Sequence, residues 1–186
     1  MKKHLKKTFI YKILVKYRSW LAKVILRRIN VMAEDAEKIA KDYSYSIKEN
    51  YRTLFQVINI ENSIRHVKEN NIKGAFVETG TWTGGASAYA LLSMMRNNDV
   101  RDYWGFDSFE GMPKPTLEDG NHGAEWIGED NFVVNNADRD ACYDYLIATG
   151  YDSEKVNLVK GWFQESLSKS KELIGSIAIL RLDGDF

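Results

Sequence analysis

Cysteine is nearly absent from this 186-residue chain, which has Cys142 alone. A single cysteine excludes an internal disulfide and is typical of a reducing compartment, so we expect a cytoplasmic protein. Cys142 has no histidine nearby in the sequence that would give metal-ligand spacing, and we expect it to pack inside a helix over residues 141–147. His66 and His122 have no serine or cysteine nucleophile pattern around them, so we interpret both as structural or surface residues. No apolar run approaches the roughly 20 residues of a membrane span.

Acidic residues are missing from the first 30 positions. Residues 1–30 hold ten Lys and Arg and no Asp or Glu, whereas the other 156 residues hold 16 basic and 26 acidic ones. The lysines recur every three or four residues and predict an amphipathic helix. Such a helix could make weak contact with an anionic membrane surface or pack in a homodimer, and of the two we favour packing. The acidic remainder argues against nucleic acid as a partner.

Residues 74–85 carry the most informative pattern, E-x-G-x-x-x-G-G. A short apolar run ends in Glu78, and a helix is predicted to begin after Gly84 and Gly85. The pattern is neither the dinucleotide fingerprint nor a P-loop. A carboxylate here would repel a pyrophosphate, but it suits a ligand with a cationic or hydroxyl end, such as S-adenosylmethionine. The alternative is an ordinary strand-to-helix turn whose glycines serve packing.

A second acidic residue, Asp107, ends the next predicted strand. It lies about 20 residues after the glycine turn, where α/β folds bind ribose hydroxyls. A carboxylate can accept two hydrogen bonds from a vicinal diol. Because it would lie at a strand tip, we expect its removal to weaken ligand binding and to change stability little. The alternative is a turn cap, since Ser108 follows.

Two further strands are predicted at residues 156–160 and 177–182. The second is an almost continuous apolar run, which predicts a buried parallel strand. Asp183 and Asp185 follow it, and paired carboxylate oxygens suit Mg²⁺. The alternative is a hairpin, because Asp-Gly is a favoured two-residue turn.

Together these motifs resemble the macrocin O-methyltransferase family (the TylF/MycF type). Members are S-adenosylmethionine- and Mg²⁺-dependent enzymes that methylate sugar hydroxyls. The resemblance covers about residues 72–186, and Thr83 departs from it because the family often has arginine there. It implies catalytic and metal-binding roles for Asp183 and Asp185. It also implies cofactor contacts by Glu78, Thr79, Gly80, Trp82, Gly84, Gly85, Asp107, Ser108, Trp162 and Phe163.

The fold that we expect is α/β, a doubly wound (Rossmann-like) parallel sheet of a class I methyltransferase. Its strands would cover about 74–79, 102–107, 156–160 and 177–182, in a domain 71–186 behind a helical N-terminal extension, 1–70. The family continues past the aspartate motif, so we expect a C-terminally incomplete chain, a fragment with one uncovered sheet edge.

Two other functions stay open at this point. The chain could be a non-catalytic partner that only binds a nucleotide, or an NAD(P)-dependent oxidoreductase, which the glycine spacing disfavours. The long irregular stretch 114–136 is either a surface loop or a lid that lines the acceptor pocket with His122, Trp126 and Phe132.

Overall fold

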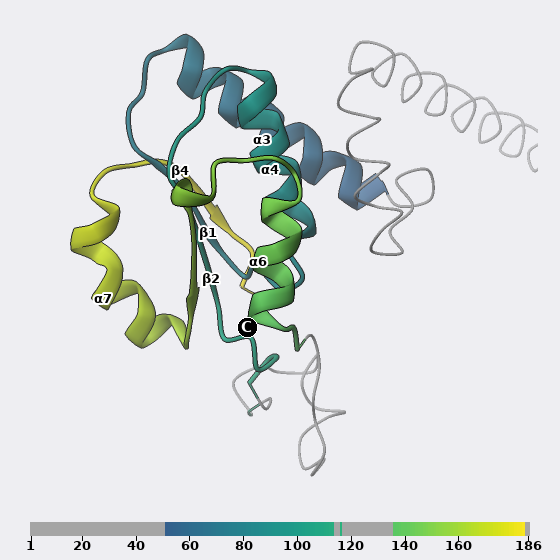
Figure 1. The fold of residues 1–186 in the computed structure, drawn as a ribbon, viewed down its shortest axis with the longest axis vertical. Helices are drawn as coiled ribbons and strands as arrows, with labels where there is room; N and C mark the ends of the chain where they lie inside the picture. The colour runs from purple at the N-terminus through teal and green to yellow at the C-terminus, as the bar shows by residue number, and fades with distance from the viewer. Residues whose placement is uncertain (1–50, 114–115, 117–135, 185–186) are drawn as a thin grey trace, which may run out of the picture.

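A computed structural model describes residues 51–113, 116 and 136–184 of the chain (Figure 1). The predicted basic helix at 1–30 lies outside the described residues. So do Asp185 and the three residues proposed for the acceptor pocket, His122, Trp126 and Phe132.

Four parallel strands form one sheet in the order β3-β2-β1-β4. They are β1 (Ala75–Thr79), β2 (Tyr103–Asp107), β3 (Val156–Lys160) and β4 (Ile177–Leu182). All four predicted strands are confirmed, each beginning within one residue of its expected start. The chain runs outward from β1 to β3 and then returns to the other side of β1, which is the doubly wound arrangement.

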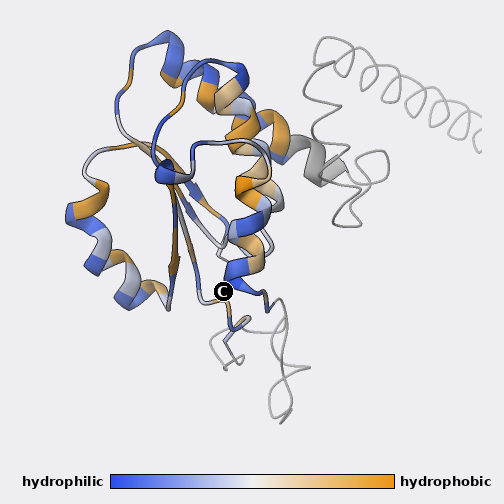
Figure 2. Cartoon of the chain, in the orientation of Figure 1, coloured by the Kyte–Doolittle hydropathy of each residue, from blue (hydrophilic) through white to orange (hydrophobic). Residues whose placement is uncertain are grey.

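Helices cover both faces of the sheet (Figure 1). On one face lie α3 (Tyr51–Glu69), α4 (Gly85–Arg96) and α6 (Arg139–Ile147), and on the other lies α7 (Phe163–Ile174). A short 3₁₀ turn, η2 (Ser153–Lys155), leads into β3. Hydrophilic and hydrophobic residues alternate along these helices in Figure 2, as expected for helices that pack on one side. The three layers confirm the predicted α/β fold.

Alternate residues of β1 enter two hydrophobic clusters, one on each face of the sheet. Phe76 belongs to the larger cluster, which includes residues of α3, α4 and α6. Ala75 and Val77 belong to the smaller one, against Phe163 and Ile174 of α7. Every residue of β1 is buried, because this strand has a neighbour on each side and a layer over each face.

A buried polar cluster joins α3 to α4. Glu61 is 5% exposed and accepts hydrogen bonds from Ser93, from Arg96 at 2.6 Å and from Asn97 at 3.0 Å. Because a buried carboxylate must keep its hydrogen-bond donors, these contacts fix how the two helices meet. The domain boundary near residue 70 stays a prediction, but α3 packs into the same core as the sheet.

The prediction that the fourth strand is buried is wrong for much of its length. Leu180 is 55% exposed and Leu182 is 72% exposed. β4 pairs only with β1 among the described strands, and α7 packs mainly over β2. An apolar run shows that burial would be favourable, but it does not specify which element provides the cover.

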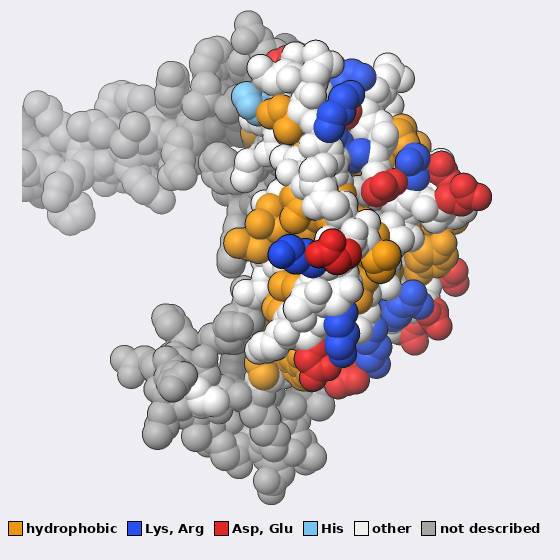
Figure 3. Space-filling model, turned by 90° about the vertical axis from the view of Figure 1, so that its left-hand side faces the viewer, with side chains coloured by type: hydrophobic (Ala, Val, Ile, Leu, Met, Phe, Trp, Pro, Cys, Tyr) orange, Lys and Arg blue, Asp and Glu red, His pale blue; other side chains and the backbone are white. Residues whose placement is uncertain are grey.

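The face that carries α7 exposes charged and hydrophobic side chains side by side. Figure 3 views the molecule from this side, where basic and acidic side chains lie interspersed with hydrophobic ones. None of the helices in the described part combines the length and apolar composition that crossing a bilayer requires.

Candidate functional site

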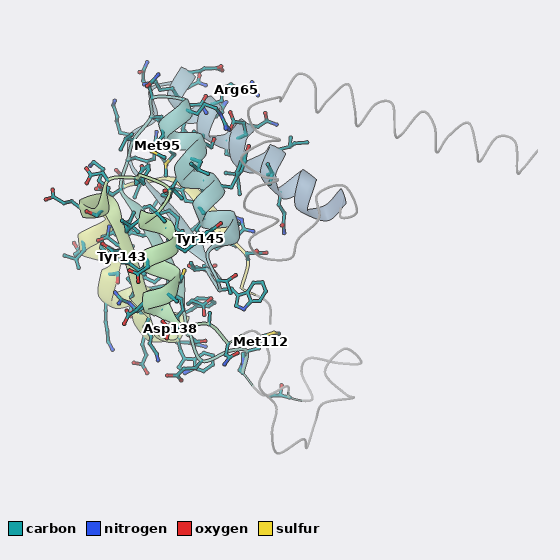
Figure 4. All side chains as sticks on the ribbon, turned by 45° about the vertical axis from the view of Figure 1, so that its right-hand side comes forward. Arg65, Met95, Met112, Asp138, Tyr143 and Tyr145 are labelled. Atoms are coloured by element: carbon teal, nitrogen blue, oxygen red, sulfur yellow. The ribbon has the colours of Figure 1, made fainter. Side chains whose placement is uncertain are left out.

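The predicted site residues gather at the end of the sheet where the parallel strands terminate. Each strand ends beside the next, so the segments that follow them come together although they are far apart in sequence. This end points toward the C-terminus mark in Figure 1. Met112, after β2, and Asp138, before α6, lie at the same end in Figure 4. The arrangement creates a candidate site along the carboxyl ends of the strands, and we call this end of the sheet the edge.

The turn between β1 and α4 is shaped by close backbone approach. Gly80 has φ +84°, and its N–H donates to the carbonyl of Phe106 at 2.8 Å. A Cβ at Gly80 would lie 2.2 Å from the carbonyl oxygen of Asp183. Only glycine fits both this torsion and this contact, so the turn and the end of β4 are held against each other.

The N-terminus of α4 faces the same edge. Gly84, with φ +84°, is its N-cap, and no side chain caps the helix there. The buried hydroxyl Thr83 Oγ1 has no hydrogen-bond partner among the described residues. Gly85 is the first residue of the helix. Uncapped amides at a helix start and a buried hydroxyl favour a polar or anionic ligand group at this turn.

Asp107 joins two unusual backbone turns. One carboxylate oxygen accepts the N–H of Trp82 at 2.7 Å, and the other accepts the N–H of Phe109 at 2.8 Å. Trp82 and Phe109 both have positive φ, +49° and +53°, which is uncommon for aromatic residues. The capping role that the sequence left open is therefore real. Each oxygen keeps a second lone-pair position, so a ribose contact stays compatible with this role.

Glu78 lies at the centre of a buried polar network. Its side chain is 1% exposed, and Oε2 accepts hydrogen bonds from Ser87 of α4 and Tyr103 of β2, both at 2.5 Å. Burial, and then the Glu78 charge, raise the pKa of Tyr103 well above its usual value, so the phenol stays a donor. Contact between Glu78 and the cofactor stays a prediction, because its carboxylate already serves three protein groups.

The third group on Glu78 is Arg181 of β4. Arg181 donates to Glu78 through one guanidinium nitrogen and to Asp183 Oδ2, at 2.5 Å, through the other. Burial tends to lower the pKa of Arg181, but Glu78 and Asp183 outweigh it, so that pKa is raised overall. The buried carboxylate of Glu78 and the exposed carboxylate of Asp183 thus share the guanidinium of Arg181.

The remaining predicted contacts occupy the same edge in different ways. Ser108 is buried, donates to the carbonyl of Gly111 at 2.8 Å and accepts from Glu110 N–H, which stabilises the turn after β2. Trp162 is 41% exposed at the start of α7. Phe163 packs beside the smaller hydrophobic cluster. Their roles as walls of an adenine pocket stay predictions.

The described residues do not form a magnesium site by themselves. In the part of the chain that the structure describes, no group of three or more His, Cys, Asp or Glu side chains lies close enough to hold a metal ion. Asp183 is paired with Arg181, and Asp185 lies outside the described residues. The Mg²⁺ assignment to these two aspartates stays a prediction.

Sequence reasoning missed three members of the site, Ser87, Tyr103 and Arg181. A signal for Arg181 was present: it is the one charged residue in an otherwise apolar strand, β4. Its register partner in β1 is Glu78, but strand order and register are needed to see this pairing. Ser87 and Tyr103 carry no comparable signal, since isolated serines and tyrosines are common in such elements.

Cys142 lies behind the glycine turn, where its Sγ would be 2.9 Å from a Cβ at Gly84. Burial, and then the charges of Glu78 and Asp107, raise the pKa of this thiol to about 12. We expect the thiol of the folded chain to react with Ellman's reagent at pH 8 at least about a hundredfold more slowly than that of the unfolded chain. Absorbance kinetics with and without urea measure this. Equal rates would contradict the burial of Cys142.

Comparison with known proteins gives consistent results. Residues 6–186 match the model of the family described as Macrocin-O-methyltransferase (TylF). The chain is 35% identical over 133 residues to demethyldecarbamoylnovobiocin O-methyltransferase of Streptomyces niveus, covering 68% of this chain and 48% of that protein. It is 28% identical over 145 residues to 8-demethyl-8-(2,3-dimethoxy-alpha-L-rhamnosyl)-tetracenomycin-C 4'-O-methyltransferase of Streptomyces olivaceus, covering 71% and 50%.

A solved structure agrees with these relatives. The O-methyltransferase NovP superposes with a TM-score of 0.56 at 31% identity, covering 70% of this chain and 53% of that one. The chain spans about half the length of these relatives. The family match extends over nearly all of the sequence, including the glycine turn, Asp107 and the Asp183 motif. The chain therefore belongs to the macrocin O-methyltransferase (TylF) family.

Proposed function

We propose that the protein is an S-adenosylmethionine-dependent O-methyltransferase that acts on a sugar hydroxyl of a small glycosylated molecule. The observation that carries the proposal is the meeting of the glycine turn, Asp107 and Asp183 at one sheet edge in a chain of this family. The name of a relative that methylates a rhamnosyl-tetracenomycin supports a sugar acceptor.

The chemistry of the edge fits the cofactor. Asp107 offers free acceptor positions for ribose hydroxyls, and the uncapped start of α4 with Thr83 suits the carboxylate of the methionine part. Bound S-adenosylmethionine supplies the methyl group on a sulfonium. These residues bind and orient, so their contribution is the placement of donor and acceptor, which is worth up to roughly 7–11 kcal/mol when both are aligned.

Asp183 is the side chain that we propose for the acceptor hydroxyl. Its side chain is 39% exposed at the edge, and Arg181 occupies only one of its two oxygens among the described contacts. The free oxygen can accept a hydrogen bond from a sugar hydroxyl and hold its oxygen in line with the methyl group. Dependence on Mg²⁺, with Asp183 and Asp185 as ligands, is an additional proposal, and no step here requires it.

The relative affinities of the protein for S-adenosylhomocysteine and NAD test the identity of the cofactor. We expect S-adenosylhomocysteine to bind more tightly than NAD, because the glycine turn lacks the dinucleotide pattern. Isothermal titration calorimetry with both ligands measures this difference. Equal or tighter binding of NAD would remove the methyltransferase proposal in favour of an oxidoreductase.

Methyl transfer tests the reaction and the metal. The natural full-length protein should move a radiolabelled methyl group from S-adenosylmethionine to a deoxysugar-bearing acceptor, and Asp183→Asn should abolish this transfer. Activity that persists in a chelator would remove the Mg²⁺ proposal and keep the methyltransferase one. Binding of the cofactor without transfer to any sugar acceptor would favour the non-catalytic alternative.

A further inference from the structure

The Asp183 backbone is fixed by the glycine turn, but its side chain is not. Asp183 N–H donates to the carbonyl of Thr79 at 2.9 Å, and the Asp183 carbonyl lies against Gly80. These contacts place the Cα of Asp183 relative to the turn. The direction of the carboxylate still depends on its own partners, and the partner that the described part of the chain supplies is Arg181.

Arg181 is itself held in place by the buried Glu78. Its side chain is 14% exposed, and one nitrogen pairs with Glu78, whose side chain is 1% exposed. Glu78 cannot turn away, because Ser87 of α4 and Tyr103 of β2 both donate to its other oxygen at 2.5 Å. A guanidinium is planar and rigid, so fixing one of its nitrogens on Glu78 also sets where the other one points.

We propose that Arg181 is a positioning residue, which transmits the fixed orientation of the buried Glu78 to the carboxylate of Asp183. The inference rests on the proposed function, since Asp183 is the group assigned to the acceptor. Glu78 thereby acts on the acceptor side through Arg181 and does not need to touch the cofactor. Lysine could replace the charge of Arg181, but not its two fixed directions.

Activity measurements test this role. In the natural full-length protein, Arg181→Ala should lower kcat for methyl transfer by about a hundredfold, the cost of a misplacement on the order of 1 Å. The Kd for S-adenosylhomocysteine should stay within about threefold, because the ribose and turn contacts remain. Added guanidinium should restore at least about a tenth of the lost kcat, and Arg181→Lys should restore little.

Arg101→Ala is the matched control. Arg101 also pairs with an aspartate two positions away, Asp99, at 2.5 Å, but it precedes β2 and therefore lies at the opposite end of the sheet. It should change stability without changing kcat. The double variant Glu78→Gln with Arg181→Met guards against misfolding, because it leaves no buried charge unpaired. It should still lose kcat by about a hundredfold.

A double-mutant cycle decides the question without activity. The change in urea midpoint caused by the double variant should differ from the sum of the changes caused by Arg181→Lys and Asp183→Asn, because the two residues share one contact. Additive changes in the urea midpoint would overturn the proposal. So would an unchanged kcat in Arg181→Ala, or a loss of kcat in that variant that is matched by an equal loss of cofactor affinity. If the natural protein transfers no methyl group to any acceptor, the proposed function fails, but the cycle still decides whether Arg181 holds Asp183.

Discussion

Gly80→Ala is expected to destabilise the chain by about 4 kcal/mol or more, which is an exceptional loss for a single substitution. The new Cβ would lie 2.2 Å from the backbone carbonyl oxygen of Asp183, and no side-chain rotation can relieve this contact because the backbone fixes the position of a Cβ. The residue also has φ +84°, where an L side chain is strained. Relief requires the end of β4 to separate from the turn, so cofactor binding should be lost as well. Urea unfolding measures the free energy of unfolding.

Gly150→Ala is the control for the torsion alone. Gly150 has nearly the same torsion, φ +87°, but a Cβ there would meet nothing within 4 Å. Its substitution should cost only about 1–2 kcal/mol, the price of the left-handed conformation. If the two variants lose the same stability, the contact between Gly80 and Asp183 does not constrain the site.

Asp107→Ala is expected to lower both cofactor affinity and stability. Loss of charge-assisted hydrogen bonds to ribose, each worth about 1.5–3 kcal/mol, should reduce affinity at least about tenfold. The strand-tip position led us to expect little change in stability. The structure alters that expectation, because the carboxylate holds the amides of Trp82 and Phe109, two residues with positive φ. We now expect a loss of about 2 kcal/mol as well.

Asp152→Ala provides the comparison. Asp152 also accepts a backbone amide, that of Glu154 at 3.1 Å, but it precedes η2 and β3, at the end of the sheet away from the site. It should cost about 1 kcal/mol, as an exposed cap does, and leave affinity for S-adenosylhomocysteine unchanged. If Asp107→Ala loses stability and keeps full affinity, Asp107 is a cap and has no contact with ribose.

Much of the fold could be predicted from local signals. Short, mainly apolar segments, each ending at or next to a charged residue, marked all four strands. Gly80 and Gly84 were recognisable because a tight turn restricts the residue type at each position. The burial of β4 was not predictable in this way, since a hydrophobic run gives the preference of a strand and not its neighbours.

The sequence alone determined the strands, the turn chemistry, and the family resemblance that the family match confirms, because these depend on residues close together in the chain. Only the tertiary structure decided that Glu78 serves Ser87, Tyr103 and Arg181. Glu78 and Arg181 are 103 positions apart and meet because β4 returns to the side of β1. Hydrogen bonds act over about 3 Å in space, whatever the separation in sequence. The partners of a buried charge therefore follow from strand order and register, which no local pattern encodes.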